Sequence, residues 1–511
     1  MKQQDLFKAV PVSRLELQSR EDLIRFITLQ QQVNEAILKD NEKLRIQIYE
    51  LAEKVLLIDD QYVVLKNNFF GKSSEKAPVP VLEEAVPLKG EKPKKTRVLL
   101  PSQRYPDAPL IERHVELKEL PNCKCCNSQM QDSGMTEDSE FLTVIPAEFY
   151  VVRQKRHKYR CVSCHGDLQT APCPPRVKPG SSYSDELLAD VAISKYDELV
   201  PVERYTTIAG RGGLEDLPPQ SLIEGTHNLA DFIEPVYHEL KKEIMESKVL
   251  HADETPHRML EGDKRQNWYL WGFSNQKTSY FELHGTRSGE VASSILANSA
   301  CEYLMSDVFS GYGKAIKDTN LIRLEKDKNS PKIQNIYCNA HARRKFKEAE
   351  DAFPDESKFF IEQYQKIYHL ESQSKEKPDI KSSNRSKMIE FFEEMKDRAM
   401  MNFTAYSSKS SIGKAMSYFL GNYDEFTKFI KNVDLPIDNN PQERLMRNPV
   451  IGRKTWYGTH SKRGAKTAAI MFSIVETCKM NNVNPRAYLK QLIQDLHAGK
   501  PAFTPSQFKS N

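Results

Sequence analysis

Two acidic residues stand in contexts that could build a metal site. Asp253 ends the short apolar run 248–253, and Asp307 ends a second apolar run, 302–307. Both runs have the length and composition of β-strands, so we expect the two carboxylates at the ends of strands in one mixed sheet. Two carboxylates together with substrate phosphate are the usual ligands of Mg²⁺. The pattern therefore predicts a divalent-cation site at this edge of the sheet.

A third acid lies in a distinctive setting near residue 440. The sequence Asp-Asn-Asn-Pro at 438–441 predicts the start of a helix, with an asparagine cap and proline at the first helical position. Glu443 falls in the first turn of this helix, and Arg447 falls one turn later on the same face. Basic residues follow closely, with Trp456 and Tyr457 among them: Arg453, Lys454, Lys462, Arg463 and Lys466. A carboxylate beside such a surface suits a metal site that acts on a polyanion.

Residues close to the three acids also have candidate roles. Glu254 is expected on the strand face opposite to Asp253, because side chains alternate along a strand. His251 shares the face of Asp253, where it could support the metal ligands or serve as a buried structural histidine. Cys338-x-x-His341 could be half of a metal site, although no matching pair of ligands is visible. We expect His341 and Arg344 close to the active site or to the nucleic acid.

Two Cys-x-x-Cys pairs predict a zinc site. Cys123 and Cys126 are separated by 34 residues from Cys161 and Cys164. Four thiolates in two such pairs match the tetrahedral preference of zinc, and metal binding would supply the folding energy of a small element. The gap is longer than in compact zinc ribbons, and Cys125 could replace a neighbour. Segments 140–145 and 148–152 are expected to be short strands.

A basic segment precedes the second cysteine pair. Five of the eight residues at 153–160 are basic: Arg153, Lys155, Arg156, Lys158 and Arg160. A basic strand beside a zinc element suits contact with a phosphate backbone. The alternative is an exposed edge strand that its charges keep soluble.

Residues 20–66 carry a seven-residue repeat. Its d positions are, in chain order, Leu23, Gln30, Ile37, Leu44, Leu51, Ile58 and Leu65, and its a positions begin at Ile27 and include Asn34 and Asn41. Six heptads in register predict a parallel coiled coil, and asparagine at a positions favours two strands. The alternative is an amphipathic helix packed on the rest of its own chain.

Composition and the remaining pattern set the wider frame. The chain has 511 residues, 74 basic against 70 acidic, with a net charge of +4 and 39% hydrophobic residues. Bulk charge therefore decides little about partners. No apolar stretch approaches 18 residues and no apolar leader follows Met1, which predicts a cytoplasmic protein without a membrane span. Segments 268–273 and 278–283 are expected to complete an antiparallel meander with the first strand, and 184–246 and 288–298 are expected to be helical.

The motifs together resemble the transposases of the insertion sequence 66 family. In chain order they are KNNFFGKSSEK at 66–76, the paired cysteines, HADETP at 251–256, SDVFSGY at 306–312, CNAHARRKF at 338–346 and DNNPQER at 438–444. The likeness covers nearly the whole chain in the order of the family. That family belongs to the DDE transposases, whose ribonuclease-H-like core carries three acids. By motif match these acids are Asp253, Asp307 and Glu443.

The resemblance implies a fold class and a division of the chain. The fold is α/β: a ribonuclease-H-like mixed-sheet core with a helical insertion, preceded by a coiled coil and a small zinc-ribbon-like element. The expected parts are the dimerising coil 1–70, a proline-rich basic linker 71–120 that could touch phosphates or be a plain connector, and the zinc element 121–178. There follow a helical DNA-binding or connecting region 179–247, the core 248–347, the insertion 348–429, the rest of the core 430–495 and a tail 496–511.

The expected function is a DDE-type DNA transposase that cleaves and joins strands at the ends of an insertion element. It would use two Mg²⁺ or Mn²⁺ ions on the three acids, and Zn²⁺ on the cysteines. Expected partners are double-stranded DNA, a second copy through the coil and other element-encoded proteins, at the bacterial nucleoid. Beyond the segment 153–160, the residues expected to contact DNA are Arg344, Arg444, Arg447, Arg453 and Lys454. The alternatives are a non-catalytic zinc-containing DNA-binding regulator and a metal-dependent structure-specific nuclease.

Overall fold

The computed structural model describes most of the chain. The described residues are 20–70, 100–104, 110, 112, 125, 139–141, 148–160, 168–261, 266–328 and 330–509. The chain divides into two compact units, 1–72 with 156–206 and 218–511, and 73–155 with 207–217. Within the described ranges, no helix has both the length and the apolar character needed to cross a membrane.

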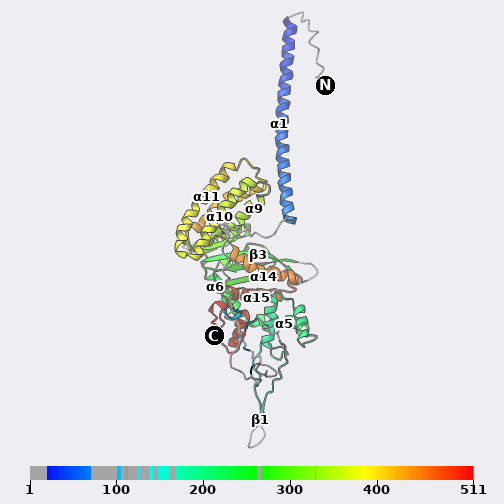
Figure 1. The fold of residues 1–511 in the computed structure, drawn as a ribbon, viewed down its shortest axis with the longest axis vertical. Coiled ribbons are helices and arrows are strands. Elements are labelled where there is room, and N and C mark those ends of the chain that lie inside the picture. The colour runs from blue at the N-terminus through cyan, green and yellow to red at the C-terminus, as the bar shows by residue number, and fades with distance from the viewer. Residues whose placement is uncertain are drawn as a thin grey trace. The chain divides into compact units, whose positions relative to one another are not determined.

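A mixed five-stranded sheet forms the centre of the first unit (Figure 1). Its strands are β3 (Val249–Met259), β4 (Gln266–Ser274), β5 (Ser279–His284), β6 (Tyr303–Ser306) and β7 (Gln334–Tyr337). They lie in the order β5-β4-β3-β6-β7. The first three strands are antiparallel neighbours, whereas β6 runs parallel to β3 and β7 runs parallel to β6. The predicted meander and the mixed sheet are therefore confirmed.

The first strand differs from its prediction at its end. We expected it to stop at Asp253, but β3 continues through Pro256 to Met259. Proline lacks an N–H group and is tolerated where a strand edge needs no donor. Strand β6 pairs with β3 only as far as His251, and the next bridge on that side joins Met259 to Thr459. On this side of β3, the stretch between His251 and Met259 is not paired with β6, so Pro256 is tolerated there. Pairing with β4 on the other side keeps the strand extended.

Helices surround the sheet and also form a separate layer. Before the sheet come α3 (Asp185–Tyr196), α4 (Val202–Arg211), α5 (Pro219–Phe232) and α6 (Glu234–Met245), and within it α7 (Glu290–Leu296) and α8 (Ser310–Lys326). The segment after β7 is helical as predicted: α9 (Asn339–Ala349), α10 (Pro354–Glu376), η3 (Pro378–Ile380), α11 (Lys381–Asn402), α12 (Ser411–Gly421) and α13 (Tyr423–Lys431). The chain ends with α14 (Asn440–Trp456), α15 (Lys462–Met480), α16 (Pro485–His497) and η4 (Pro505–Gln507).

The N-terminal third contains a few isolated elements. Helix α1 (Arg20–Phe70) covers the whole heptad repeat, and α2 (Pro101–Arg104) is a single turn. The prediction of a strand at 148–152 is wrong, since these residues are not part of a strand. Instead β1 (Lys158–Arg160) pairs antiparallel with β2 (Leu168–Thr170). The basic segment 153–160 is therefore strand only in its last three residues. Of segment 140–145, residues 140 and 141 are not in a strand, and the rest lies outside the described residues.

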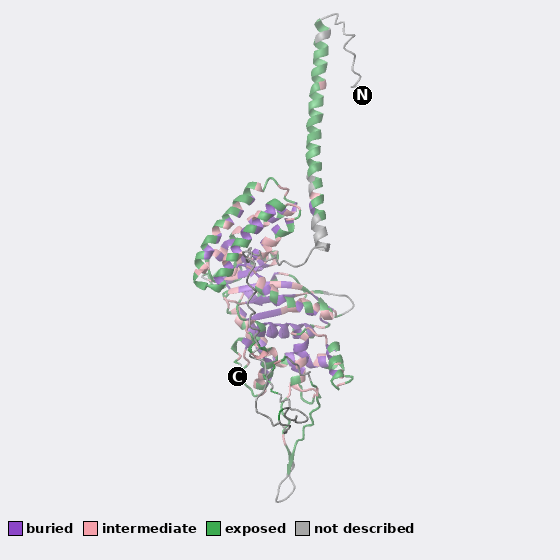
Figure 2. Ribbon diagram, viewed as in Figure 1, coloured by how far each residue is buried: buried purple, intermediate pink, exposed green. Residues whose placement is uncertain are grey.

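Two hydrophobic cores pack against the sheet, whose strands are largely buried (Figure 2). One core joins strands β3–β5 to α3, α5–α8 and α14–α16, and the other joins β6 and β7 to the helices α9–α13. Adjacent residues of β6 belong to different cores, because Leu304 packs in the first core and Met305 in the second. This is the alternation expected of a strand buried on both faces.

Helix α15 closes one edge of the sheet with side-chain hydroxyl groups. The N–H of Phe281 donates to Ser473 Oγ at 2.8 Å, and the N–H of Ser279 donates to Thr477 Oγ1 at 3.0 Å. Thr477 Oγ1 in turn donates to the carbonyl of Ser279 at 3.0 Å. These bonds satisfy backbone groups of β5 that would otherwise be unpaired at a sheet edge.

A glycine in the middle of β4 lets α14 approach the sheet. A Cβ atom at Gly272 would lie 2.3 Å from Gln442 Nε2, 2.8 Å from Met446 Sδ and 2.9 Å from Phe281 Cε1. Since Gly272 is paired with Asp253, its missing side chain would point to the face that carries the first acid. Helix α14, with the third acid in its first turn, therefore packs on that same face.

We expect Gly272→Ala to lower the free energy of unfolding by about 1–3 kcal/mol, because the added methyl group must push α14 away from the sheet. Denaturant unfolding of the purified protein measures this change. The matched control is Gly313→Ala in α8, where an added Cβ meets nothing within 4 Å and alanine favours the helix. Equal stability of the two variants would contradict the tight packing of α14 on β4.

Candidate active site

The sheet places the first two acids side by side. Strands β3 and β6 pair in parallel with His251 opposite Met305, and continuing that register sets Asp253 opposite Asp307. Residues in register on adjacent parallel strands point to the same face of the sheet. The N–H of Phe309 donates to Asp307 Oδ1 at 3.1 Å and so fixes the carboxylate just beyond the end of β6.

Asn439 connects the start of α14 to β3. Its side chain is 1% exposed, and its Nδ2 donates to the carbonyl of Ala252 at 2.9 Å. Its backbone N–H donates to Cys338 Sγ at 3.1 Å, directly after β7. These two bonds fix the first turn of α14 beside the strand that carries Asp253. The helix begins one residue earlier than predicted, with Asn439 as its N-cap and Pro441 in its second position.

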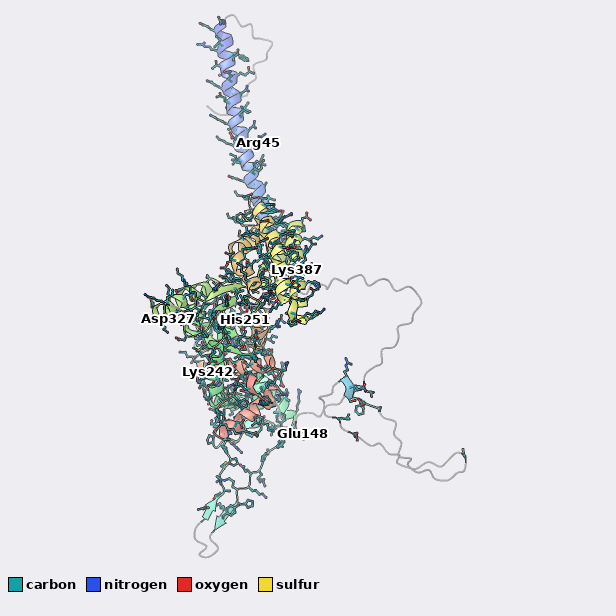
Figure 3. The ribbon with its side chains drawn as sticks, turned by 90° about the vertical axis from the view of Figure 1, so that its left-hand side faces the viewer. Arg45, Glu148, Lys242, His251, Asp327 and Lys387 are labelled. Carbon is teal, nitrogen blue, oxygen red and sulfur yellow. The ribbon has the colours of Figure 1, made fainter. Side chains whose placement is uncertain are left out.

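His251 completes this connection. Its Nδ1 lies 2.9 Å from Asn439 Oδ1. Because Asn439 Nδ2 already donates to Ala252, the amide oxygen accepts and His251 Nδ1 carries the proton. The imidazole is buried inside the first unit, and burial lowers the pKa of His251, which keeps the ring neutral (Figure 3). Of the two roles considered for His251, the structure therefore favours a structural one that supports the acid-bearing helix.

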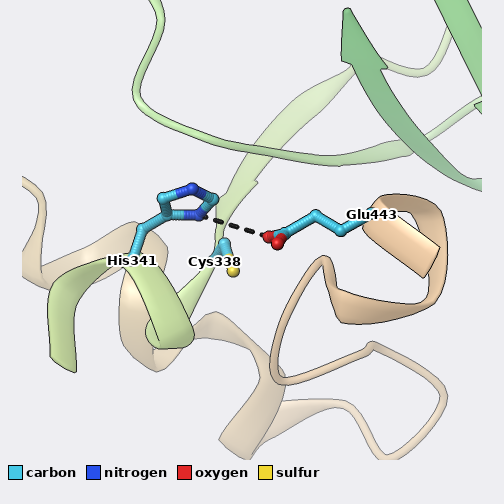
Figure 4. A group of neighbouring side chains, drawn as sticks. All are labelled: Cys338, His341 and Glu443. Atoms are coloured by element: carbon cyan, nitrogen blue, oxygen red, sulfur yellow. Dashed lines mark ion pairs between the residues drawn. The ribbon is translucent and has the colours of Figure 1, made fainter. Parts of the chain in front are cut away.

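The third acid faces a histidine of α9 (Figure 4) and lies close to an arginine of the same helix. Glu443 Oε1 lies 3.7 Å from His341 Nδ1, and Glu443 Oε2 lies 3.9 Å from Arg344. Ligand atoms of Cys338, His341 and Glu443 all lie within 4.8 Å of one another. Glu443 Oε1 is buried and, within the described residues, has no hydrogen-bond partner. A buried carboxylate oxygen of this kind can be satisfied by water or by an ion.

The donor atoms near Glu443 differ in the cations they suit. Burial raises the pKa of the Cys338 thiol to about 12, and the sulfur already accepts the N–H of Asn439. Since a metal ligand must be a thiolate, Cys338 is poorly suited to bind a cation at neutral pH. The carboxylates offer oxygen ligands, which are the choice of Mg²⁺ and Mn²⁺.

The acids influence one another electrostatically. Burial raises the pKa of Asp253 well above its usual value, and the negative charges of Glu254, Asp307 and Glu443 raise it further. The N–H of Glu254 donates to Asp253 Oδ1 at 3.0 Å, which opposes this effect only in part. A divalent cation among these carboxylates would remove the repulsion, so their charges suit such a cation. In the described residues, the group of ligand atoms within 4.8 Å of one another contains Glu443 but neither Asp253 nor Asp307.

A separate network holds Glu254 on the opposite face, as the alternation of β3 predicted. Glu254 is 9% exposed and accepts hydrogen bonds from Arg287 at 2.6 and 2.9 Å and from Tyr312 at 2.5 Å. The guanidinium of Arg287 also stacks on the ring of Phe309, 4.1 Å from its centroid. Arg287 thus contacts the residue after Asp253 and a residue two positions after Asp307. Sequence reasoning missed this residue.

The predicted DNA-contacting residues are distributed over several surfaces. Arg153, Lys155, Arg156 and Lys158 are exposed, and of Arg160 only the backbone in β1 is described. Arg444, Arg447 and Lys454 are exposed on α14, and Arg453 is half-buried. Two residues of the expected basic surface are instead neutralised: Arg463 pairs with Glu224 and Asp231, and Lys466 with Asp231 and Glu234.

The predicted zinc ligands Cys123, Cys126, Cys161 and Cys164 lie outside the described residues. Cys125, the proposed substitute ligand, is an exposed free cysteine. The structure therefore leaves the zinc site as a prediction from the spacing of the cysteines.

Comparison with protein families agrees with the motif resemblance. The model of the IS66 family of transposases matches residues 180–467, a span that contains all three acids. The chain belongs to the IS66 transposase family. The IS66 C-terminal element matches residues 473–503, and the zinc-finger binding domain of transposase IS66 matches residues 121–165. The latter span includes the four cysteines.

Relatives of this IS66 transposase family member occur in Sinorhizobium fredii. The uncharacterized protein y4hP is 25% identical over 413 residues, which cover 75% of this chain and 72% of that protein. The uncharacterized protein y4jD is 26% identical over 394 residues, covering 74% and 75%. The uncharacterized protein y4qI is 26% identical over 432 residues, covering 81% and 77%.

We expect Asp253→Asn to stabilise the protein at pH 7 when divalent cations are removed with EDTA. A carboxyl group whose pKa is raised by folding opposes folding when it is ionised. This penalty is absent below the unfolded pKa of about 3.9 and is complete above the raised folded pKa. The stability difference between the variant and the wild type, measured by denaturant unfolding, should therefore shrink as the pH falls from 7 to 4.

Adding Mg²⁺ should reverse the order of stability. Bound cation stabilises the wild type by about 2.7 kcal/mol at 100 times its dissociation constant, and the variant should gain much less. A variant that is less stable than the wild type in EDTA would contradict the electrostatic repulsion described for Asp253.

Proposed function

We propose that this transposase uses a DDE-type site in which Asp253, Asp307 and Glu443 hold two divalent cations, Mg²⁺ or Mn²⁺. The observation that carries the proposal is the register of the sheet, because continuing it sets Asp253 opposite Asp307. Helix α14, which carries Glu443, packs on the same face of the sheet. The raised pKa of Asp253 and the buried Oε1 of Glu443, which accepts no hydrogen bond within the described residues, support a cation among these groups.

The chemistry would be hydrolysis of a phosphodiester bond at the element end, followed by attack of the freed 3′-hydroxyl on target DNA. When bound, such cations activate the attacking oxygen and stabilise the leaving oxygen. The protein side chains would position the strand. Arg344, half-exposed and 3.9 Å from Glu443, is placed to bind a phosphate oxygen close to the acids. Exposed Arg444 and Arg447, on the acid-bearing helix, extend the positive surface.

We propose further that the five-stranded sheet is the ribonuclease-H-like core and that α10–α13 form its insertion. The division of the chain predicted from the sequence, with a linker at 71–120 and a zinc element at 121–178, is retained as part of this proposal. The zinc element and the basic segment 153–160 would bind element-end DNA at the bacterial nucleoid, where other element-encoded proteins could join them.

Helix α1 is proposed to pair with a second copy as a coiled coil. Apolar residues at its a and d positions are exposed: Ile27, Ile37, Leu44, Ile48, Leu51, Val55, Ile58 and Tyr62. Burying an exposed apolar stripe of this length against the same stripe of an identical helix would stabilise the pair of helices. Pairing would allow one complex to hold two DNA ends.

We expect Asp253→Asn, Asp307→Asn and Glu443→Gln each to slow strand cleavage by at least about 10²–10³-fold while DNA affinity stays nearly unchanged, because isosteres keep the shape and remove the charge. The assay incubates purified protein with element-end DNA and Mg²⁺ and separates nicked and joined products. The control is Glu325→Gln, which removes an exposed carboxylate from α8 of the same core. Cleavage at the wild-type rate by Glu443→Gln would disprove the third ligand.

The same assay distinguishes the alternative functions. Joined products support a transposase, and nicked products alone would indicate a structure-specific nuclease. DNA binding without either product, in the presence of Mg²⁺ or Mn²⁺, would indicate a regulator.

The cysteine pairs should bind about one zinc ion per chain. We expect Cys161→Ser to lose this zinc, together with specific binding of element ends, because the small element depends on the metal for its folding. Elemental analysis measures the metal, and Cys173→Ser, which alters an exposed cysteine outside both pairs, is the control. Full zinc content in Cys161→Ser would show that other residues hold the metal.

A further inference from the structure

A pocket lies at the C-terminal end of α14, away from the three acids. It has a volume of about 510 Å³ and is lined by residues from three segments. Strand β3 contributes Arg258, β4 contributes Asn267, and the end of α14 contributes Arg453, Lys454 and Tyr457. The pocket therefore combines positive charge, an amide and an aromatic ring.

Its positive charges are uncompensated. In the part of the chain that the structure describes, no carboxylate forms an ion pair with Arg258, Arg453 or Lys454, in contrast to Arg463 and Lys466 on the next helix. Burial and the nearby charge of Arg258 lower the pKa of Arg453. Cations gathered in this way repel one another, and a bound anion removes that repulsion.

Tyr457 has an unusual backbone for its residue type. It ends α14 in the left-handed region, with φ of 65°, and its side chain is 69% exposed. Glycine or asparagine fits such a position with less strain. A bulky residue there is an outlier whose ring gains little from burial, so its presence points to a role for the ring itself.

The segment after Tyr457 is fixed against β3. Gly458 has φ of 130°, and a Cβ atom there would lie 2.2 Å from the carbonyl of Arg258. The N–H of Thr459 donates to that carbonyl at 2.9 Å, and the N–H of Leu260 donates to the carbonyl of Thr459 at 2.8 Å. The ring of Tyr457 is thus attached to a rigid turn, as a stacking platform requires.

We propose that this pocket binds one unstacked nucleotide of the DNA substrate, with its base on the ring of Tyr457 and its phosphates on Arg258, Arg453 and Lys454. Aromatic rings accept any base by stacking, and Asn267 offers hydrogen bonds to a base edge. The proposal rests on the proposed function, because it assumes that this chain binds DNA across the sheet.

The test compares two labelled duplexes of about 40 base pairs, identical except that one carries a single unpaired nucleotide at its centre. Fluorescence anisotropy with the full-length protein at about 0.1 M salt measures the affinity of each. We expect the wild type to bind the duplex with the unpaired nucleotide about fivefold or more tightly than the paired duplex. Tyr457→Phe should keep this preference.

Tyr457→Asn should abolish the preference while binding the fully paired duplex as the wild type does. Asparagine tolerates the left-handed backbone, so this variant is expected to fold, and its thermal unfolding checks that it does. Asp253→Asn should retain the preference, because the acids do not contribute to the pocket.

Two outcomes would overturn the proposal in different ways. Equal affinity of the wild type for both duplexes, or an unchanged preference in Tyr457→Asn, would contradict the nucleotide site and leave the proposed function intact. Failure of the wild type to bind either duplex would contradict the proposed function, and the nucleotide site with it.

Discussion

The candidate site depends on the hydrogen bonds of one buried asparagine. Asn439 accepts from His251, donates to the backbone of β3, and donates its own N–H to Cys338 after β7. Two strands and a helix that are far apart in the sequence therefore meet at a single residue. Because each of these groups is buried, breaking one bond would leave a polar atom unpaired, at a cost of about 1–3 kcal/mol. The position of Glu443 relative to Asp253 follows from this arrangement.

The sequence predicted well the strands that carry the first two acids, because strands of this kind depend on local pattern. Short apolar runs gave β3 and β6, and the Asn-Pro signal gave the start of α14 to within one residue. Gly272 also had a signal, since an isolated glycine inside an aromatic strand suggests a close approach. The contact of Arg287 with Glu254 had no comparable signal in the sequence. It joins two ordinary charged residues through tertiary packing, and spacing along the chain does not record such a contact.

The errors have similar physical reasons. The strand through Pro256 was predicted to end early, because the rule for proline assumes that both edges of a strand are paired. Arg463 and Lys466 were assigned to a basic surface from their proximity in sequence, but acids of α5 and α6 neutralise them. The charge of a surface depends on which helices meet, and that is decided by the fold.

The helical insertion also has a consequence for when the site first exists. Glu443 follows Asp307 by 136 residues, and α15, which closes the sheet edge at β5, follows later still. At about 5–20 residues per second, a ribosome needs about 7 to 30 s to make the segment between the second and third acids. A growing or prematurely terminated chain would therefore hold two acids without the third. By this order of synthesis, the proposed three-acid site is complete only in products of nearly the full length.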